Sequence, residues 1–455
     1  MCGAALPITS VYPAMNSKKL CAKLEDWVAS GLIAREQATA IAAYEEGRKK
    51  GPGWGLLIFS GFGAVALGLG VILLFAYNWQ DMHKFAKLGV IFAALILGHG
   101  GGLWLRQRRY PDGVVEAAHL LGSMLFGAGI FLIAQIYHVS AHYPDAFLIW
   151  AGGALLLTWA LPSIPQGLLA AVLLGIWACT EAIDYNTGPA IAPLLVLLGL
   201  GLPAWRLRSP VLLGASTLAF ALVVTAVLTT NQKSFFLSLL GVSALYFALS
   251  RLTARHAALP QAPTVFRRSG LLLYLPLLFV LSFPDVINAF SRAGCFDGDT
   301  SRWLIAMPLL SAAFALNAWA IIQTMREQEA CGAGELLSLL APAAMLAVFL
   351  TCCWPKQYLP EYTEGSIAII SIAANLFFLH HALSELWRGC SETRAGLVAF
   401  GSLLLAALAF ARFTDLFESL LARGVVFLLM AAFLFYVAFE YQRKGQTPPR
   451  AERMP

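Results

Sequence analysis

The sequence predicts an all-α protein, a polytopic transmembrane helical bundle of about 14 spans (about 12–14). Of its 455 residues, 59% are hydrophobic and 12% are charged, whereas a soluble protein has about 25% charged residues. Apolar stretches recur almost without a break from Gly55 to Tyr441, so one membrane domain explains them better than several soluble domains. The basic residues also alternate between two sets of loops, as orientation in a membrane requires.

The charged segment before the first apolar run predicts a small cytoplasmic helical hairpin over residues 18–50. Leu24 and Trp27 follow the three-to-four-residue spacing of a helix, Ser30-Gly31 breaks it, and Ile33 begins a second run. A cap that packs on the membrane surface or on the inner loops explains this amphipathic pattern, and a partner-binding module is the alternative.

Residues 1–17 are predicted to be a disordered tail. Met15 directly precedes Asn16-Ser17-Lys18-Lys19, so either Met1 or Met15 could be the true start. No cleavable signal peptide is expected, because the first apolar run comes only after this charged segment, and that run would act as an uncleaved insertion signal.

The spans are predicted from apolar runs near the length of about twenty residues that crosses a bilayer. Three of them, the fourth, sixth and ninth, are short. Pro162 and Pro165 beside the fourth span, and Pro189 and Pro193 in the sixth, leave room for a re-entrant hairpin and a lower count. The predicted spans lie at 55–77, 88–105, 117–137, 146–161, 166–183, 189–205, 211–230, 234–250, 269–283, 303–323, 335–353, 366–387, 395–411 and 424–441.

The loop charges test this span assignment independently. With a cytoplasmic N-terminus, 23 of the 31 lysines and arginines fall in or beside the inner loops and 8 on the opposite side. Dropping one span would invert every later loop and spoil this contrast. We therefore expect both termini in the cytoplasm, a transmembrane domain over residues 51–441 and a disordered cytoplasmic tail over residues 442–455.

Composition also argues against several partners and cofactors. The formal net charge of +6 comes from short basic clusters between apolar runs. These clusters predict the lipid bilayer as the partner and no nucleic acid. The eight cysteines form no C-x-x-C pair, which indicates neither a zinc site nor a disulfide framework. No nucleotide-binding loop, nucleophile elbow or haem motif is present, and no cofactor or metal is predicted.

Several short segments carry a resemblance to a known family. They are Leu24-Glu25-Asp26-Trp27, Gly31-Leu32-Ile33, Asn78-Trp79, Gln135-Ile136-Tyr137-His138 and Trp150, with Arg412-Phe413-Thr414-Asp415-Leu416-Phe417 and Arg423-Gly424-Val425-Val426-Phe427 near the C-terminus. With these segments the sequence resembles the bacterial membrane-protein family "domain of unknown function 2157" over about residues 18–180. The resemblance implies a bacterial inner membrane, no assigned activity, and for longer members a small partner protein with a GDY-x-x-L-x-Y motif.

The predicted spans contain almost no charged residue near their centres. A proton- or sodium-coupled transporter normally needs an embedded carboxylate, so this composition argues against that class. The polar candidates near the membrane midplane are Gln135, Asn317, Asn375 and His99.

The densest polar segment follows the third span and gives the candidate polar site. It comprises Gln135, Tyr137, His138, His142 and Asp145. His138 and His142 are four residues apart, so both imidazoles would share a face if the helix continued, with Asp145 orienting one of them. This is the spacing of a metal-binding pair, and a metal or catalytic site is the functional alternative. Ser140 and Pro144 indicate that the helix has ended, and the Glu of H-E-x-x-H is missing. Loop histidines that only form hydrogen bonds are the commoner case.

Two further groups are secondary candidates. His381 and Glu385 are spaced to share one helical face, which predicts an ion pair or hydrogen bond rather than a ligand set. Arg412 with Asp415 and Glu418 predicts a surface ion pair. The glycine-rich segment Gly98-His99-Gly100-Gly101-Gly102 lacks the ending of a phosphate-binding loop, so it predicts close helix packing instead.

These observations favour a non-enzymatic role. That role would be a permease-like carrier of a neutral or lipidic substrate, or the scaffold of a membrane complex. The alternative is an intramembrane or envelope enzyme with an outer-face site around Gln135, His138, His142 and Asp145.

Overall fold

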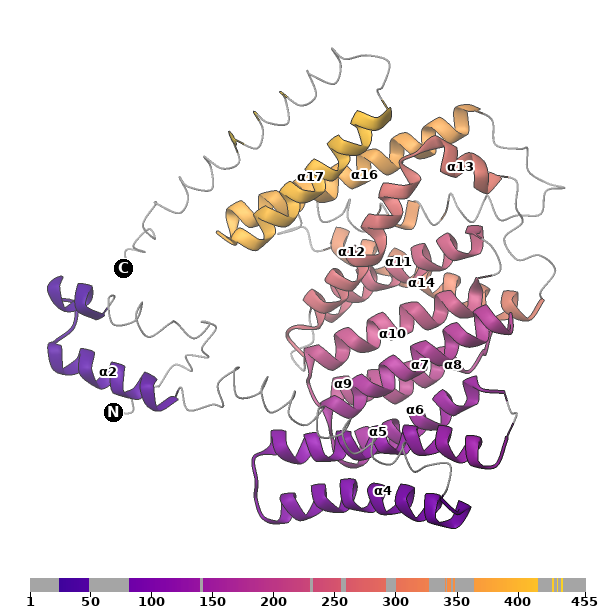
Figure 1. Cartoon of the computed structure of the whole chain (residues 1–455). Helices are drawn as coiled ribbons and strands as arrows, with labels where there is room; N and C mark the ends of the chain where they lie inside the picture. The colour runs from indigo at the N-terminus through magenta and orange to yellow at the C-terminus, as the bar shows by residue number, and fades with distance from the viewer. Residues whose placement is uncertain are drawn as a thin grey trace. The chain divides into compact units, whose positions relative to one another are not determined.

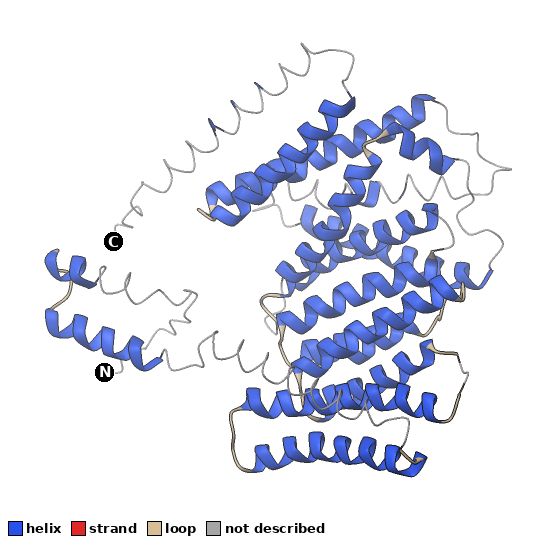
Figure 2. Cartoon of the chain, viewed as in Figure 1, coloured by secondary structure: helices blue, strands red, loops and turns tan. Residues whose placement is uncertain are grey.

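The structure, a computed structural model, describes seven stretches of the chain. Figure 2 shows that the regular elements in these stretches are helices. The chain divides into two units, residues 1–89 and 90–455, and each is described by itself. The described stretches are residues 24–48, 82–139, 142–229, 232–254, 259–291, 300–326 and 364–415, with single positions at 340, 342–344, 347, 428, 432, 435 and 436.

The first unit contains two short helices, residues 24–29 and α2 (Arg35–Arg48). Gly31 lies between them with φ of 70°, a conformation that glycine adopts without strain. The Gln37 side chain accepts a hydrogen bond from the Ala34 backbone and caps the start of α2. The two helices fall in the two halves of the predicted hairpin, whose packing as a cap stays a prediction.

The transmembrane region is a succession of helices, and most helices that follow one another in the chain pack side by side (Figure 1). The principal contacts join α6 to α7, α7 to α10, α11 to α12 and α14, α12 to α16, and α16 to α17. The helices are α4 (Lys84–Gln107), α5 (Asp112–Ile136), α6 (Pro144–Ala160), α7 (Ile164–Asp184), α8 (Ala192–Val196), η1 (Leu197–Gly201), α9 (Leu202–Arg206), α10 (Pro210–Leu228), α11 (Gln232–Thr253), α12 (Ala262–Leu281), α13 (Pro284–Ser291), α14 (Thr300–Arg326), α16 (Glu364–Ser391) and α17 (Ala395–Asp415).

The core lies along the middle helices of this succession. Of the most apolar 18-residue segment of α10, 61% is buried, whereas only 11% of the corresponding segment of α4 is buried. Leu174, Leu212, Leu240 and Leu278 come from four different helices and are fully buried. The central helices therefore supply most of the buried apolar surface in the described part of the chain, where α4 leaves most of its apolar surface exposed.

Nine helices in the described part of the chain are long and apolar enough to cross a membrane. All nine coincide with predicted spans, so the prediction of a helical membrane bundle is confirmed. The spans predicted at 55–77, 335–353 and 424–441 lie outside the described residues, single positions apart. The count of 14 stays a prediction.

Two apolar segments form shorter helices, and both were predicted to be short. α6 has 17 residues, and α8, η1 and α9 form one run of about 15 residues, which spans about 22 Å at 1.5 Å per residue. Pro203 has no backbone N–H to donate to the preceding turn, and η1, a π-helical segment, ends at Gly201 within that turn. This run is therefore shorter than the roughly 30 Å hydrocarbon core.

The ninth predicted span requires a correction at its start. The sequence placed it at residues 269–283, whereas α12 begins seven residues earlier at Ala262 and has 20 residues. The prediction started too late because Arg267 and Arg268 were assigned to a loop. In the structure both arginines are part of the helix, where Arg267 has an acidic partner on α16.

Candidate functional site

The candidate polar site starts where α5 ends. The helix finishes at Ile136, Tyr137 follows as its C-cap, and His138 takes a left-handed φ of 49°. Pro144 then opens α6. His138 and His142 therefore share no helical face, so their spacing of four residues does not form a metal-binding pair. The helix ends where Ser140 and Pro144 indicated that it should.

His142 instead pairs with a residue of the next helix. Its Nε2 atom lies 2.6 Å from Oε1 of Glu181, near the C-terminal end of α7. The second carboxylate oxygen of Glu181 accepts a hydrogen bond of 2.5 Å from the Thr187 hydroxyl. Glu181 is buried and the His142 side chain is 35% exposed. The pair thus joins the start of α6 to the end of α7.

Asp145 belongs to the same group. One ligand atom each from His142, Asp145 and Glu181 lies within 4.8 Å of the other two. Asp145 is exposed in the first turn of α6, and among the described residues its carboxylate has no hydrogen-bond or ion-pair partner. We call these three residues the outer triad, because the loop-charge prediction places them on the outer side.

Two tyrosines lie beside the outer triad, and one of them contacts it. The Tyr143 hydroxyl donates a hydrogen bond to Asp184 at the end of α7, and this bond raises the pKa of the phenol to about 12. The Tyr185 ring packs edge-on against His142, with the ring centroids 4.0 Å apart. The imidazole is therefore held between a carboxylate and an aromatic ring.

The structure brings together only part of the sequence-predicted site. His142 and Asp145 meet, whereas Gln135, Tyr137 and His138 form no hydrogen bond or ion pair with them in the described part of the chain. Sequence reasoning missed Glu181 and Tyr185 as partners of His142, and Thr187 as the partner of Glu181. Consecutive spans joined by a short loop run antiparallel, and this pairing was the one signal that could have indicated that the start of α6 meets the end of α7.

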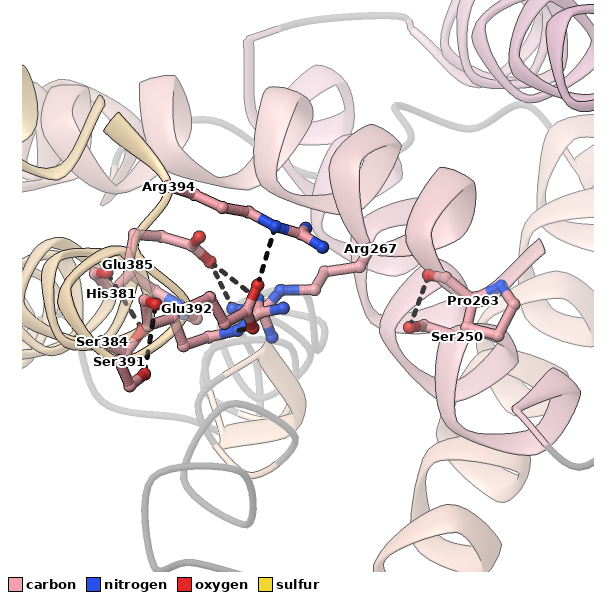
Figure 3. Close-up of polar contacts among 10 residues, drawn as sticks. Ser250, Pro263, Arg267, His381, Ser384, Glu385, Ser391, Glu392 and Arg394 are labelled. Carbon is pink, nitrogen blue, oxygen red and sulfur yellow. Dashed lines mark hydrogen bonds and ion pairs between the residues drawn. The ribbon is translucent and has the colours of Figure 1, made fainter. Parts of the chain in front are cut away.

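A second polar group joins α12 to α16. Figure 3 shows Arg267 reaching Glu385, with which it forms an ion pair, while Arg388 lies 3.6 Å from the same carboxylate. The Glu385 side chain is only 3% exposed. The predicted interaction of Glu385 with His381 is thereby corrected, because an arginine from another helix takes the carboxylate.

His381 occupies an aromatic environment instead. Its ring stacks on Phe247 at 5.9 Å and meets the edge of Tyr274 at 5.5 Å. Both ring nitrogens and the Tyr274 hydroxyl are buried without a hydrogen-bond partner among the described residues. This environment positions the imidazole as a core residue between α11, α12 and α16.

Arg412 contacts the end of α12. Its guanidinium donates to the backbone oxygen of Ser282 at 3.2 Å and to the hydroxyl at 3.1 Å, and it lies over the Phe283 ring. The side chains of Asp415 and Glu418 lie outside the described residues, so the predicted ion pair with them stays a prediction.

Glycines allow α4 and α5 to approach closely. A Cβ atom on Gly98 would lie 2.8 Å from the Cα atom of Gly122. His99 and His119 stack at 5.8 Å beside this contact. The predicted role of the Gly98–Gly102 segment in helix packing is confirmed at Gly98 and Gly102, the latter of which faces the His119 ring.

Other polar side chains within the spans bond to neighbouring helices. Such bonds satisfy polar groups that lipid would leave without a partner. The bonded residues are far apart in the sequence, so each bond fixes one helix against another. The bonds are Ser123 to Gln166, Thr217 with Ser269, Tyr246 to the Thr217 carbonyl, Asn317 to the Ala244 carbonyl, and Ser371 and Asn375 to the Ser282 carbonyl.

Comparison with known proteins supports the membrane assignment. Residues 25–167 match the family described as "Predicted membrane protein (DUF2157)", which confirms the resemblance over that part of the chain. The match covers α2, α4, α5, α6 and the first residues of α7. No curated protein and no solved structure matches the chain.

Proposed function

We propose that the chain is a non-enzymatic protein of the bacterial inner membrane that acts as the scaffold of a membrane complex. The match to a family of membrane proteins and the hydrogen bonds between the helices of this chain support the proposal. A scaffold needs a rigid bundle with surface left over for partners. It needs no polar path through the membrane.

The use of the polar side chains within the spans is the observation that carries this proposal. Asn317 and Ser371 reach across to the backbone of a neighbouring helix, and Thr217 bonds to the Ser269 side chain. Each of these groups therefore contributes to helix packing. A carrier of a polar solute would instead direct such groups toward a shared pathway.

An exposed face of α4 supports the same role. Phe92, Ile96 and Leu103 form one exposed stripe along α4, on the side away from the glycine contact with α5. In a membrane such a stripe faces lipid or another transmembrane segment. The family resemblance suggests a small protein with a GDY-x-x-L-x-Y motif as the partner.

An envelope enzyme is a second candidate, because His142, Asp145 and Glu181 gather at one end of α6 and α7. A histidine held by a carboxylate is an arrangement that general acid-base catalysis uses. The enzyme hypothesis predicts that His142→Ala fails to restore the function that the deletion strain lacks. The scaffold hypothesis predicts that this variant complements the deletion as well as His138→Ala does.

Reconstitution tests the scaffold proposal directly. The full-length chain is co-expressed with the small GDY-motif protein, extracted in mild detergent and analysed by size-exclusion chromatography. It is also reconstituted alone in liposomes to measure transbilayer movement of fluorescent lipids and of neutral solutes. The proposal expects a co-eluting complex and no movement beyond that of empty vesicles.

Two results would overturn it. Movement of a lipid or solute above the empty-vesicle rate would establish the carrier function instead. Failure of the two proteins to co-elute at micromolar concentrations, when each is well folded alone, would overturn the proposal of a scaffold that binds this partner. A matched variant with Ile96→Asn on the exposed stripe of α4 tests whether that face is used, with Leu222→Asn, exposed on α10, as the control.

A further inference from the structure

The outer triad combines two kinds of metal ligand at one place. His142 offers an imidazole nitrogen, and Asp145 and Glu181 each offer a carboxylate oxygen, all within 4.8 Å of one another. Asp145 lies in the first turn of α6, Glu181 in the last turns of α7, and His142 in the loop directly before α6.

We propose that His142, Asp145 and Glu181 bind one divalent transition-metal ion, which clamps the start of α6 to the end of α7. The proposal does not depend on the scaffold function. It concerns a binding site that neither the sequence pattern nor the family match assigns.

The distances fit an ion with small movements. Ligand atoms about 2.0–2.1 Å from Zn²⁺ at tetrahedral angles lie about 3.3 Å apart. Nε2 of His142 and Oε1 of Glu181 are 2.6 Å apart, so the ion would replace the shared proton and widen the gap by less than about 1 Å. Asp145 must approach by about 1.5 Å at most, which a rotation of this exposed side chain allows.

The surroundings hold the ligands in place, as they do in known metal sites. The Thr187 hydroxyl binds the second oxygen of Glu181, which orients the first oxygen toward His142. The Tyr185 ring packs against the imidazole. Glu181 is 7% exposed, so its carboxylate is presented from a fixed position.

The set of ligands indicates the kind of ion. An imidazole nitrogen disfavours Mg²⁺ and Ca²⁺, which prefer oxygen ligands throughout, and it suits Zn²⁺, Mn²⁺ or Co²⁺. Three protein ligands leave at least one position for water. A plain hydrogen bond between His142 and Glu181 would explain these two residues, but it gives no role to Asp145, whose carboxylate has no partner among the described residues.

Metal content of the full-length protein tests the proposal. The protein is purified in detergent, stripped with EDTA and dialysed against Zn²⁺, and bound zinc is measured by mass spectrometry. Co²⁺ serves as a second probe, because its visible absorption reports the ligand geometry. We expect about one ion per chain and at least a roughly tenfold weaker apparent affinity in His142→Ala and Asp145→Asn.

Matched controls separate this site from adventitious binding. His138→Ala removes an exposed histidine of the same loop, and Asp112→Asn makes the same change in the first turn of α5. Both controls should bind as the unmodified protein does. Asp145→Asn leaves the contact between His142 and Glu181 intact, so its loss of metal cannot be attributed to a broken hydrogen bond.

Three results would overturn the proposal. The first is an unmodified protein that retains no more zinc than a variant in which all three ligands are replaced. The second is a loss of zinc in the two controls as large as that in the ligand variants. The third is full zinc affinity in folded Asp145→Asn. Size-exclusion profiles and melting temperatures establish that each variant is folded.

Discussion

Arg267 of α12 forms an ion pair with Glu385 of α16, 118 residues further along the chain. The Glu385 side chain is 3% exposed and that of Arg267 is 20% exposed, so both charges are largely removed from water. A buried carboxylate is tolerated when a paired cation compensates for the lost hydration. The pair therefore fixes one helix against the other.

Glu385→Ala is expected to destabilise the bundle strongly. The substitution leaves the Arg267 guanidinium partly buried without its carboxylate, and breaking such a pair costs about 3–5 kcal/mol. Glu392→Ala is the matched control, because Glu392 pairs with Arg388 and Arg394 at exposed positions and its loss costs at most about 1 kcal/mol. Denaturant unfolding in detergent measures both. Equal losses in the two variants would contradict a stabilising role of the buried pair.

Gly98→Ala is expected to separate α4 from α5. Its new Cβ atom would lie 2.8 Å from the Cα atom of Gly122, and a backbone atom cannot turn aside as a flexible side chain can. Forcing such a contact costs about 1–3 kcal/mol. Gly100→Ala is the control on the same helix, because a Cβ atom at Gly100 would meet no other atom within 4 Å. A lower melting temperature is expected for the first variant alone. A drop in both, or in neither, would argue against a tight glycine contact.

The sequence predicted helix positions well because apolar run length carries that information. The prediction failed where a charged residue belongs to a partly buried helix. Arg267 was assigned to a loop because arginine is costly inside a membrane, and a residue 118 positions away, which removes this cost, leaves no mark on the local pattern. The start of α12 was misplaced for this reason.

The candidate site shows the same limit. His142 and Asp145 were recognised because they lie close together in a polar segment. Their partner Glu181 is 39 residues from His142 and was assigned to an outer loop with other acids. Spacing along one chain indicates which residues share a helix, whereas partners on two helices depend on how the helices pack. The antiparallel pairing of α6 and α7 supplies that information.

Tyr143→Phe is expected to show a pH-dependent loss of stability. The hydrogen bond to Asp184 raises the pKa of the Tyr143 phenol to about 12, above the ordinary value of 10.0. The neutral phenol is the form that the fold favours, so its contribution is complete below about pH 10 and is lost as the pH rises toward about 12. The melting temperature of the variant should be lower than that of the unmodified protein at about pH 8.

The difference between the two proteins should then shrink between about pH 10 and 12. Tyr137→Phe is the control, because Tyr137 is exposed in the same loop and has no hydrogen-bond partner for its hydroxyl among the described residues. A difference that stays constant across this pH range, or one that Tyr137→Phe reproduces, would show that the Tyr143 hydroxyl is not the cause.

Cysteine labelling is expected to place the two ends of α5 on opposite sides of the membrane. The helix has 25 residues and is about 37 Å long, which is enough to cross the roughly 30 Å hydrocarbon core. Arg109 precedes it in a basic loop and His138 follows it. With the eight native cysteines replaced, His138→Cys in spheroplasts should react with a membrane-impermeant maleimide. Arg109→Cys should react only after lysis, because basic loops stay in the cytoplasm.

The labelling pattern distinguishes three topologies. Reaction of His138→Cys alone supports a cytoplasmic N-terminus and an outer side for the triad formed by His142, Asp145 and Glu181. Reaction of Arg109→Cys alone would mean that the whole bundle has the opposite orientation, because every later loop changes side with this one. Reaction of both would mean that α5 does not cross the membrane. Labelling of both variants after denaturation shows that each cysteine is present, so protection reflects the bilayer.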